Sequence, residues 1–355
     1  MTLYSGMAAA VVLMMAPGAW GATILMGPTG TYTTLAQAVG AAQPGDTINI
    51  QAATYYDQVA FIAKPLTLVG INGMPVFLGT TALSNAKGFI VADASLTVNN
   101  LQFQGAFTPL GYNGAGIRYE AGDLTVINSR FVNNQDGILA TPLTAGTGTL
   151  TVQNSTFIGN GVASGTGAGF AHGIYANNLA AVTVTASTFE GTQVGHDIKS
   201  RAVSTTITNN YLDDGVTGTT SYAIDLPNGG NAVIAGNTIV QGPNTQNLIM
   251  IAYGAEGLTN PLNRALITQN TLTNNKQGGV GVRNFVTDPS LTDLVFLNTY
   301  TGLAVPTIGP FRLIGLNDGP PPDPASIPEP ASWAMLAFGL TGFGLLAAGR
   351  RQGLV

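Results

Sequence analysis

The sequence predicts an all-β protein whose main domain is a right-handed parallel β-helix, a solenoid of stacked coils. Short segments of alternating apolar and polar residues recur between positions 90 and 302, at intervals of roughly 23 to 33 residues. Charged residues make up only 8% of the 355 residues, against about 25% in a typical soluble domain. The chain also contains 47 glycines. This composition excludes a helical bundle or coiled coil and suits coils that turn at small polar residues.

Charge and cysteine content exclude further classes. The net charge of −5 argues against a nucleic-acid partner, which would require a basic surface. The chain has no cysteine, so it has no disulfide framework and no thiolate metal site. We predict no metal site of any other kind and no cofactor.

The first 21 residues are predicted to be a signal peptide. Residues 7–16 (MAAAVVLMMA) form an apolar run, and Ala19 and Gly21 place small residues before a cleavage site after Gly21. The segment before this run lacks Lys and Arg, which leaves the true start codon open, and a buried core helix is the alternative interpretation.

The mature protein is predicted to begin with a capped solenoid, residues 22–317. Residues 30–40 indicate a strand end followed by a short helix from about Leu35, and residues 44–50 and 63–70 indicate the first coils. An open solenoid end would expose apolar surface and an unpaired edge, so a cap is expected. This order resembles the amino-terminal cap of pectate-lyase-like right-handed β-helices.

Eight segments align without gaps and define the coils. Each is a strand followed by a polar pair and an apolar anchor. The anchors are Phe103, Phe131, Phe157, Phe189, Leu212, Ile239, Leu272 and Tyr300. Most polar pairs contain asparagine, at Asn100, Asn128, Asn154, Asn209, Asn210, Asn237, Asn270 and Asn298. Asparagines stacked in register can form a hydrogen-bonded ladder, so we interpret them as structural.

A second strand of each coil carries the candidate chemistry. The segments AGIRYE, DGILAT, HGIYAN, HDIKSR and YAIDLPN begin at residues 115, 136, 172, 196 and 222; NLIMIAY, from residue 247, follows in a register that the pattern does not determine. If each shared Ile points into the core, the outward columns gather polar residues on one face. His172 and His196, the only histidines, then occupy the same position on neighbouring coils, about 4.8 Å apart.

Lys199 and Arg201 project from one strand of this face, and Asp225 lies beside Lys199 on the next coil. The resemblance to pectate-lyase-like β-helices, several of which are lyases, implies a polysaccharide site here. In that scheme Lys199 is the base, Arg201 binds the uronate carboxylate, and His196 or Tyr222 donates a proton. The remaining substrate-binding candidates are His172, Tyr175, Tyr222, Asp225, Asn228 and Glu256. Tyr175 and Tyr222, stacked, would offer platforms for sugar rings.

The same residues allow a purely structural interpretation. Lys199 and Asp225 would then form an ion pair worth under about 1 kcal/mol, and the histidines an ordinary stack. Whether the protein is an enzyme stays open. A polysaccharide lyase comes first and a glycoside hydrolase second, because Asp213 and Asp214, the acid pair closest to a hydrolase pattern, lie in a predicted turn.

The C-terminus is predicted to be a sorting segment. A Pro-rich linker, residues 318–327, precedes residues 328–355, which contain Pro-Glu-Pro at 328–330, an uncharged span at 331–349 and the pair Arg350 and Arg351. Nineteen uncharged residues can cross a bilayer as a helix. This order resembles the PEP-CTERM sorting signal of Gram-negative, exopolysaccharide-producing bacteria. A plain membrane anchor is the alternative.

The resemblance implies an exosortase partner, a membrane contact before processing, and a final place at the outer surface or in the extracellular matrix. We therefore expect an exported β-helix that binds or processes polysaccharide. A structural matrix protein or adhesin is the alternative, and an ice- or crystal-binding solenoid is a weaker one. The identity of the glycan, the oligomeric state and cleavage of the C-terminal segment stay open.

Overall fold

A computed structural model describes residues 21–109, 111, 113–162, 171–287 and 293–313. The predicted signal peptide (apart from Gly21), the Pro-rich linker and the helix at 331–349 lie outside these residues, and the domain boundaries stay predictions. Within the described part of the chain, no helix is long and apolar enough to cross a membrane. The description below concerns the unit that ends at Arg312, extended by the last residue of its final strand.

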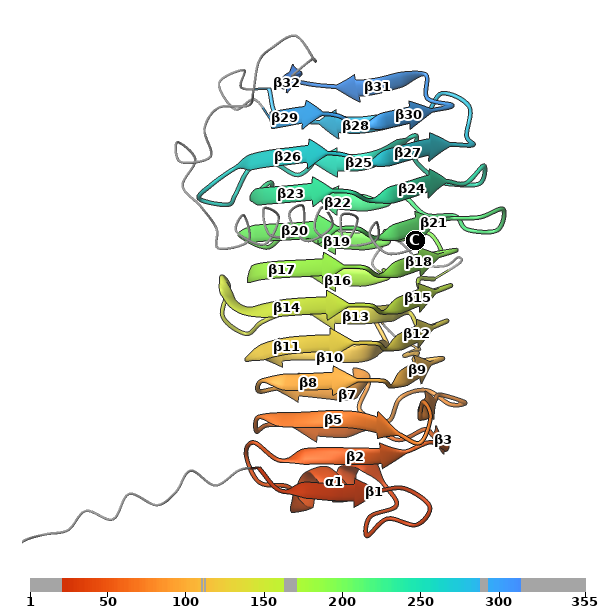
Figure 1. Cartoon of the computed structure of the whole chain (residues 1–355), viewed down its shortest axis with the longest axis vertical. Coiled ribbons are helices and arrows are strands. Elements are labelled where there is room, and N and C mark those ends of the chain that lie inside the picture. Colours follow the sequence, from red (N-terminus) through yellow and green to blue (C-terminus); the bar gives the residue numbers. More distant parts are fainter. Residues whose placement is uncertain (1–20, 110, 112, 163–170, 288–292, 314–355) are drawn as a thin grey trace, which may run out of the picture. The chain divides into compact units, whose positions relative to one another are not determined.

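The unit is a parallel β-helix. Each coil contributes strands to three parallel sheets, and the coils stack one above another (Figure 1). The first sheet contains β1 (Thr23–Met26), β2 (Thr47–Gln51), β5 (Leu66–Ile71), β8 (Leu96–Asn99), β11 (Asp123–Ile127), β14 (Thr147–Gln153), β17 (Leu179–Thr185), β20 (Ser204–Thr208), β23 (Asn231–Ala235), β26 (Arg264–Thr268), β29 (Asp293–Phe296) and β32 (Phe311–Leu313).

The two other sheets each have ten strands. The second sheet contains β3 (Thr54–Tyr56), β6 (Val76–Leu78), β9 (Gln102–Gln104), β12 (Arg130–Val132), β15 (Thr156–Ile158), β18 (Thr188–Glu190), β21 (Tyr211–Asp213), β24 (Thr238–Gln241), β27 (Thr271–Asn274) and β30 (Thr299–Thr301). The third contains β4 (Ala60–Ile62), β7 (Gly88–Asp93), β10 (Ala115–Ala121), β13 (Asp136–Ala140), β16 (Ile174–Ala176), β19 (Ile198–Ser200), β22 (Ile224–Leu226), β25 (Ile249–Tyr253), β28 (Val280–Asn284) and β31 (Val305–Ile308).

The predicted anchors pair with one another along the second sheet, as the alignment requires. The rings of Phe131 and Phe157 stack with centroids 4.7 Å apart, and those of Phe157 and Phe189 with centroids 4.6 Å apart. A Cβ atom on Gly137 would come within 2.8 Å of the Phe157 ring, which explains the glycine before the core Ile. The coil register predicted from the anchors is confirmed.

The asparagines divide into two structural groups. Asn100, Asn128, Asn154 and Asn209 have positive φ, which asparagine tolerates well. Asn210, Asn237, Asn270 and Asn298 instead form a ladder, buried at its first three members, in which the backbone N–H of one coil donates to the side-chain oxygen of the next, at 2.9 Å in each case. The structural interpretation of these residues is confirmed.

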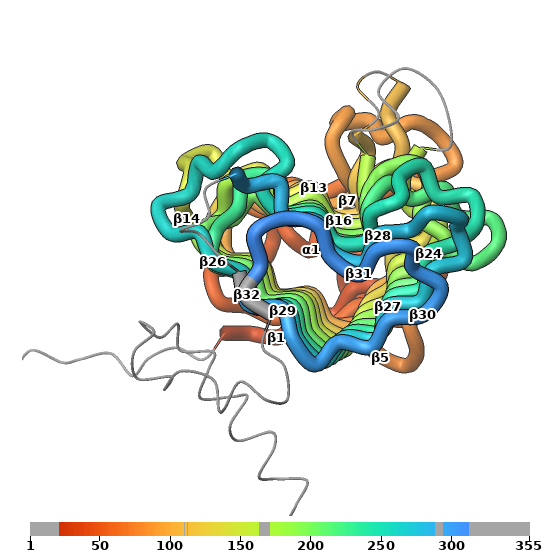
Figure 2. Tube along the Cα trace, turned by 90° about the horizontal axis from the view of Figure 1, so that it is seen from above, coloured from red at the N-terminus to blue at the C-terminus, as the bar shows by residue number. Residues whose placement is uncertain are grey.

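The predicted capping helix is α1 (Leu35–Ala41). The Thr34 hydroxyl accepts a hydrogen bond from the Gln37 N–H and starts the helix. Leu35, Ala38 and Val39 are buried in the hydrophobic core. Viewed along the axis of the coils, α1 lies inside their outline (Figure 2). The helix therefore covers the end of the core at the first coil.

The register of β25 differs from the simplest reading of the sequence. Ile251, and not Ile249, pairs with Ile224, so Ala252 follows Lys199 and Asp225 in its column. Ile249, and not Asn247, therefore lies two residues before the core isoleucine of this strand. Ile249, Met250 and Ile251 are all apolar and all buried, so alternation of polarity could not distinguish the registers.

Candidate functional site

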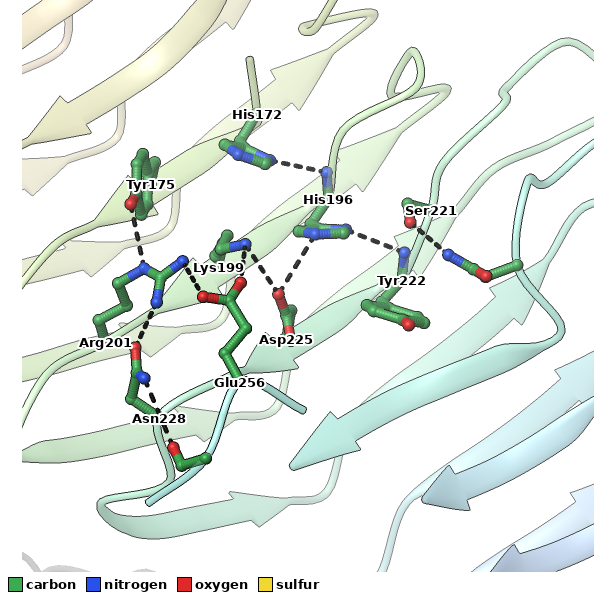
Figure 3. Close-up of polar contacts among 12 residues, drawn as sticks. His172, Tyr175, His196, Lys199, Arg201, Ser221, Tyr222, Asp225, Asn228 and Glu256 are labelled. Atoms are coloured by element: carbon green, nitrogen blue, oxygen red, sulfur yellow. Dashed lines mark hydrogen bonds and ion pairs between the residues drawn. The ribbon is translucent and has the colours of Figure 1, made fainter. Parts of the chain in front are cut away.

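The candidate site lies on the outer side of the third sheet and is built by β16, β19, β22 and the segments around them. Tyr175, Lys199 and Asp225 are direct neighbours on these three strands. His172, His196 and Tyr222 lie two residues before the core isoleucines, and Glu256 comes from the loop after β25. Figure 3 shows that these side chains point toward one another. The structure thus brings together all the residues that we selected from the sequence.

A bend positions the histidine column. Strict alternation would put a residue two positions before a core isoleucine on the inner side. In the HGI and HDI segments, however, β16 and β19 begin only at Ile174 and Ile198. His172 and His196 therefore lie in corners before the strands, and their rings stack at 5.0 Å. Tyr222 continues this stack, with its ring 5.1 Å from that of His196.

Asp136, His172 and His196 each accept a hydrogen bond from a backbone N–H of the next coil. An Asp136 carboxylate oxygen accepts from the His172 N–H at 2.8 Å, and His172 Nδ1 accepts from the His196 N–H at 2.9 Å. His196 Nδ1 accepts from the Tyr222 N–H at 3.0 Å. A nitrogen that accepts carries no proton, so we assign both rings the tautomer protonated on Nε2.

Both histidines are buried, and the Asp225 carboxylate makes them chemically different. His172 is 1% exposed, and burial, with the nearby charges of His196, Lys199 and Arg201, lowers its pKa well below the ordinary value. His172 is thus a neutral structural acceptor. His196 Nε2 instead lies 3.2 Å from a carboxylate oxygen of Asp225.

Asp225 is the centre of one half of the site. Its side chain is almost completely buried, and the oxygen that contacts His196 also contacts Lys199 Nζ at 3.2 Å. Burial alone would raise the pKa of Asp225, but the hydrogen bond from His196 and the charge of Lys199 outweigh it and lower that pKa. Asp225 is therefore an ionised carboxylate that holds two potential proton donors.

Arg201 is the centre of the other half. Its Nη2 contacts a Glu256 carboxylate oxygen at 2.7 Å, and its Nε donates to the Tyr175 hydroxyl at 3.0 Å. Its Nη1 donates to the side-chain oxygen of Asn228. The second Glu256 oxygen lies 3.3 Å from Lys199 Nζ. Lys199 and Arg201 thus converge on a single carboxylate.

The geometry corrects two expectations about this face. His172, His196 and Asp225 were expected on an outward surface, but all three are buried, whereas Glu256 keeps 47% of its side chain exposed. Tyr175 and Tyr222 do not stack with each other: Tyr175 makes an edge contact with His172, and Tyr222 packs on His196. They lie in different columns, so each can offer a ring face or hydroxyl separately.

The sequence reasoning missed Asp197. This residue replaces the glycine that precedes the core isoleucine in the three preceding coils, and its carboxyl is buried. Burial and the nearby Asp214 raise the pKa of Asp197 well above the ordinary value. The sequence did carry a signal for it: the segment HGI at residues 172–174 becomes HDI at residues 196–198, with an acid in place of glycine.

The acid pair Asp213 and Asp214 lies elsewhere. Asp213 ends β21 of the second sheet and accepts from the Gly215 N–H at 2.8 Å, which is the turn expected from the sequence. Both residues line a cavity of about 470 Å³ together with Glu190 and Gln193. In the described part of the chain, no group of three or more His, Asp or Glu residues is arranged to hold a metal ion.

These observations define the protein as a parallel β-helix with a cluster of paired charges on one sheet. Residues 326–352 match the family model described as the PEP-CTERM protein-sorting motif, so the chain is an exported protein that carries this motif. No curated protein sequence matches the chain.

Among solved structures, the chain is similar to the PL6 family alginate lyase AlyGC, with 16% identity and a TM-score of 0.52. The match covers 79% of this chain but only 39% of that one. A pectin methylesterase from Aspergillus niger matches with 12% identity over 90% of this chain and 97% of that one, at a TM-score of 0.39. At such identities the likeness to the alginate lyase supports the fold alone.

Proposed function

We propose that the site on the third sheet binds an acidic polysaccharide, with Lys199 and Arg201 holding a uronate carboxylate. The observation that carries the proposal is the convergence of both cations on one partly exposed carboxylate, that of Glu256. A guanidinium and an ammonium around one point form an anion site, and the planar guanidinium suits a carboxylate.

The surroundings suit a sugar polymer. Tyr175 and Tyr222 border the cations, and amphipathic rings can pack against sugar faces while their hydroxyls form hydrogen bonds. Arg283 lies three rungs beyond Lys199 in the same column, which corresponds to about 14 Å. Arg283 packs 4.2 Å from the Phe285 ring and pairs with no carboxylate among the described residues. A polysaccharide that runs along the solenoid axis would contact both Lys199 and Arg283.

Binding is tested by calorimetry of the purified protein with alginate, pectate and glycosaminoglycan oligosaccharides. Arg201→Ala should weaken binding at least about tenfold, because a charge-assisted hydrogen bond contributes about 1.5 to 3 kcal/mol. Arg264→Ala is the matched control, since Arg264 is exposed on β26 of the first sheet. Equal affinities of the Arg201 and Arg264 variants, or no binding of any uronate by the wild type, would contradict the proposal.

Lyase activity is the second candidate. Lys199 Nζ and His196 Nε2 contact the same buried carboxylate oxygen, and the Tyr222 ring packs on His196, so an amine and a phenol lie in one cluster. In β-elimination, Lys199 would remove the proton beside the uronate carboxylate while Arg201 binds that carboxylate. Tyr222 would protonate the leaving glycosidic oxygen, and a carbon–carbon double bond would replace the broken carbon–oxygen bond. The alternative acid, His196, does not suit this role, because its Nδ1 accepts the Tyr222 N–H and loss of the Nε2 proton would leave an imidazolate anion.

The double bond makes this reaction measurable by ultraviolet absorbance. Incubation with uronate polymers should raise the absorbance for the wild type, and Lys199→Ala should remove at least about 99% of the rate. An unchanged rate in Lys199→Ala would exclude this mechanism. Binding without any rise in absorbance would leave a non-catalytic binding protein at the surface or in the matrix.

The sorting motif supports the cellular location that this function requires. We propose that an exosortase processes the segment from residue 328 and that the helix predicted at 331–349 holds the chain in the membrane until then. The β-helix would afterwards act at the outer surface or in the extracellular matrix of a Gram-negative cell.

A further inference from the structure

Glu256 occupies the place where the proposed ligand would bind. Its two oxygens reach Arg201 Nη2 at 2.7 Å and Lys199 Nζ at 3.3 Å, although 57 residues separate it from Lys199. It does so from a short loop with Gly254 and Gly257 in positive-φ conformations, tied by a hydrogen bond from the Glu256 N–H to the Pro227 carbonyl. The backbone of the loop is therefore anchored while the carboxylate extends over the two cations (Figure 3).

The carboxylates of Asp225 and Glu256 differ in how easily they can move away from Lys199. Asp225 is buried on the strand next to Lys199, and its removal would require the sheet to open. Glu256 keeps nearly half of its side chain in solvent, and its long side chain can rotate away without moving the backbone. Lys199 and Arg201 are held largely buried at 12% and 17% exposure, so they stay in place while a ligand carboxylate that makes the same two contacts takes the position of the Glu256 carboxylate.

We propose that Glu256 is a tethered internal competitor: it fills the anion position between Lys199 and Arg201, and a uronate carboxylate binds by displacing it. This proposal rests on the proposed function. It changes the role of Glu256 from a substrate-binding group to a gate, by which we mean a side chain that fills the site until a ligand displaces it. The gate favours ligands with several carboxylates, because each further contact helps to offset the loss of the internal pair. Glu256 also indicates the class of ligand: the position that its side chain fills suits a carboxylate, so we expect a ligand that carries carboxylates.

The test is the affinity for a uronate oligosaccharide of the wild type, Glu256→Gln and Glu190→Gln, measured by calorimetry at one pH and salt concentration. Glutamine keeps the size of the side chain and removes its charge. Glu190→Gln is the matched control, because Glu190 is an exposed glutamate on β18 of the second sheet and makes the same change in net charge. Glu256→Gln should bind roughly three- to tenfold more tightly than the wild type, and Glu190→Gln should bind like the wild type.

The outcomes separate this inference from the function on which it rests. If Arg201→Ala loses binding but Glu256→Gln binds no better than Glu190→Gln, Glu256 is not a competitor and the binding function stands. Weaker binding by Glu256→Gln would make Glu256 a ligand-binding group and would also overturn the inference. If neither the wild type nor Glu256→Gln binds any uronate, the proposed function itself fails, and the gate fails with it.

Discussion

At the scale of single residues, the site depends on which polar groups are already engaged. His172 and His196 use Nδ1 to accept backbone hydrogen bonds, so only Nε2 remains for other contacts. Asp225 is held ionised by its neighbours, whereas the buried Asp136 and Asp197 have pKa values well above the ordinary one. Residues of the same type thus have different roles, and hydrogen bonding and burial decide which.

His172 should make stability depend on pH. Because its folded-state pKa is depressed, its contribution is present above about pH 6.5 and is lost as the pH falls below that value. Asparagine can keep an acceptor near the position of Nδ1 but does not titrate. Between pH 6.5 and 5, the free energy of unfolding should fall by about 2 kcal/mol more in the wild type than in His172→Asn.

Denaturant unfolding of both proteins at several pH values measures this difference. The buried aspartates titrate in both proteins, so their opposite contributions cancel in the comparison. Parallel curves for the two proteins would show that His172 titrates normally in the folded state.

At the scale of elements, coils are held together by stacked identical positions. Phe131 lies between Phe103 and Phe157 in a continuous stack, and the asparagine ladder repeats the same hydrogen bond in successive coils. The repeated pattern let the sequence predict both the anchor register and the alignment of five third-sheet strands. It failed at β25, where three successive apolar residues carried no alternation.

The candidate site was predictable only where it follows this repeat. Lys199 and Asp225 are neighbours because their strands are in register, which the aligned isoleucines reveal. The contacts of Glu256 depend on the path of a loop and on its backbone hydrogen bond to Pro227, and no periodic pattern encodes either. The burial of Asp197 goes with a bend before β19, which strict alternation does not include.

The phenylalanine stack supplies a stability prediction. Phe131→Ala should lower the free energy of unfolding by about 3 to 5 kcal/mol, because the lost ring leaves a cavity with rings on both sides. Phe61→Ala on β4, where the side chain is 57% exposed, should change it by less than about 0.5 kcal/mol. Denaturant unfolding measures both variants, and similar losses would mean that the stack contributes little.

At the scale of the whole unit, each coil contacts mainly its two neighbours, so stability is the sum of local terms along the axis. Coils in the middle have partners on both sides. The last complete coil of the described residues, with β29 to β31, keeps most of its described side chains partly or fully exposed, in contrast to the middle. We therefore expect local opening to start at that end.

Amide hydrogen exchange followed by mass spectrometry tests this gradient. Peptides that contain β12 to β21 should exchange most slowly, and peptides that contain β29 to β31 at least about tenfold faster, because a coil at an end opens without breaking two interfaces. Uniform exchange along the unit would indicate that the solenoid opens as a single cooperative block.

The helix α1 at the first coil has a consequence for how the chain is made. An exported chain crosses the membrane with its amino end first, so the closed end of the solenoid emerges before the rest. Each later coil can then pair its strands with the exposed strand edges of the coil before it. Its core side chains can pack on those of that completed coil. The protein can therefore fold progressively, in the order in which it arrives outside, while its carboxyl end is still inside the cell.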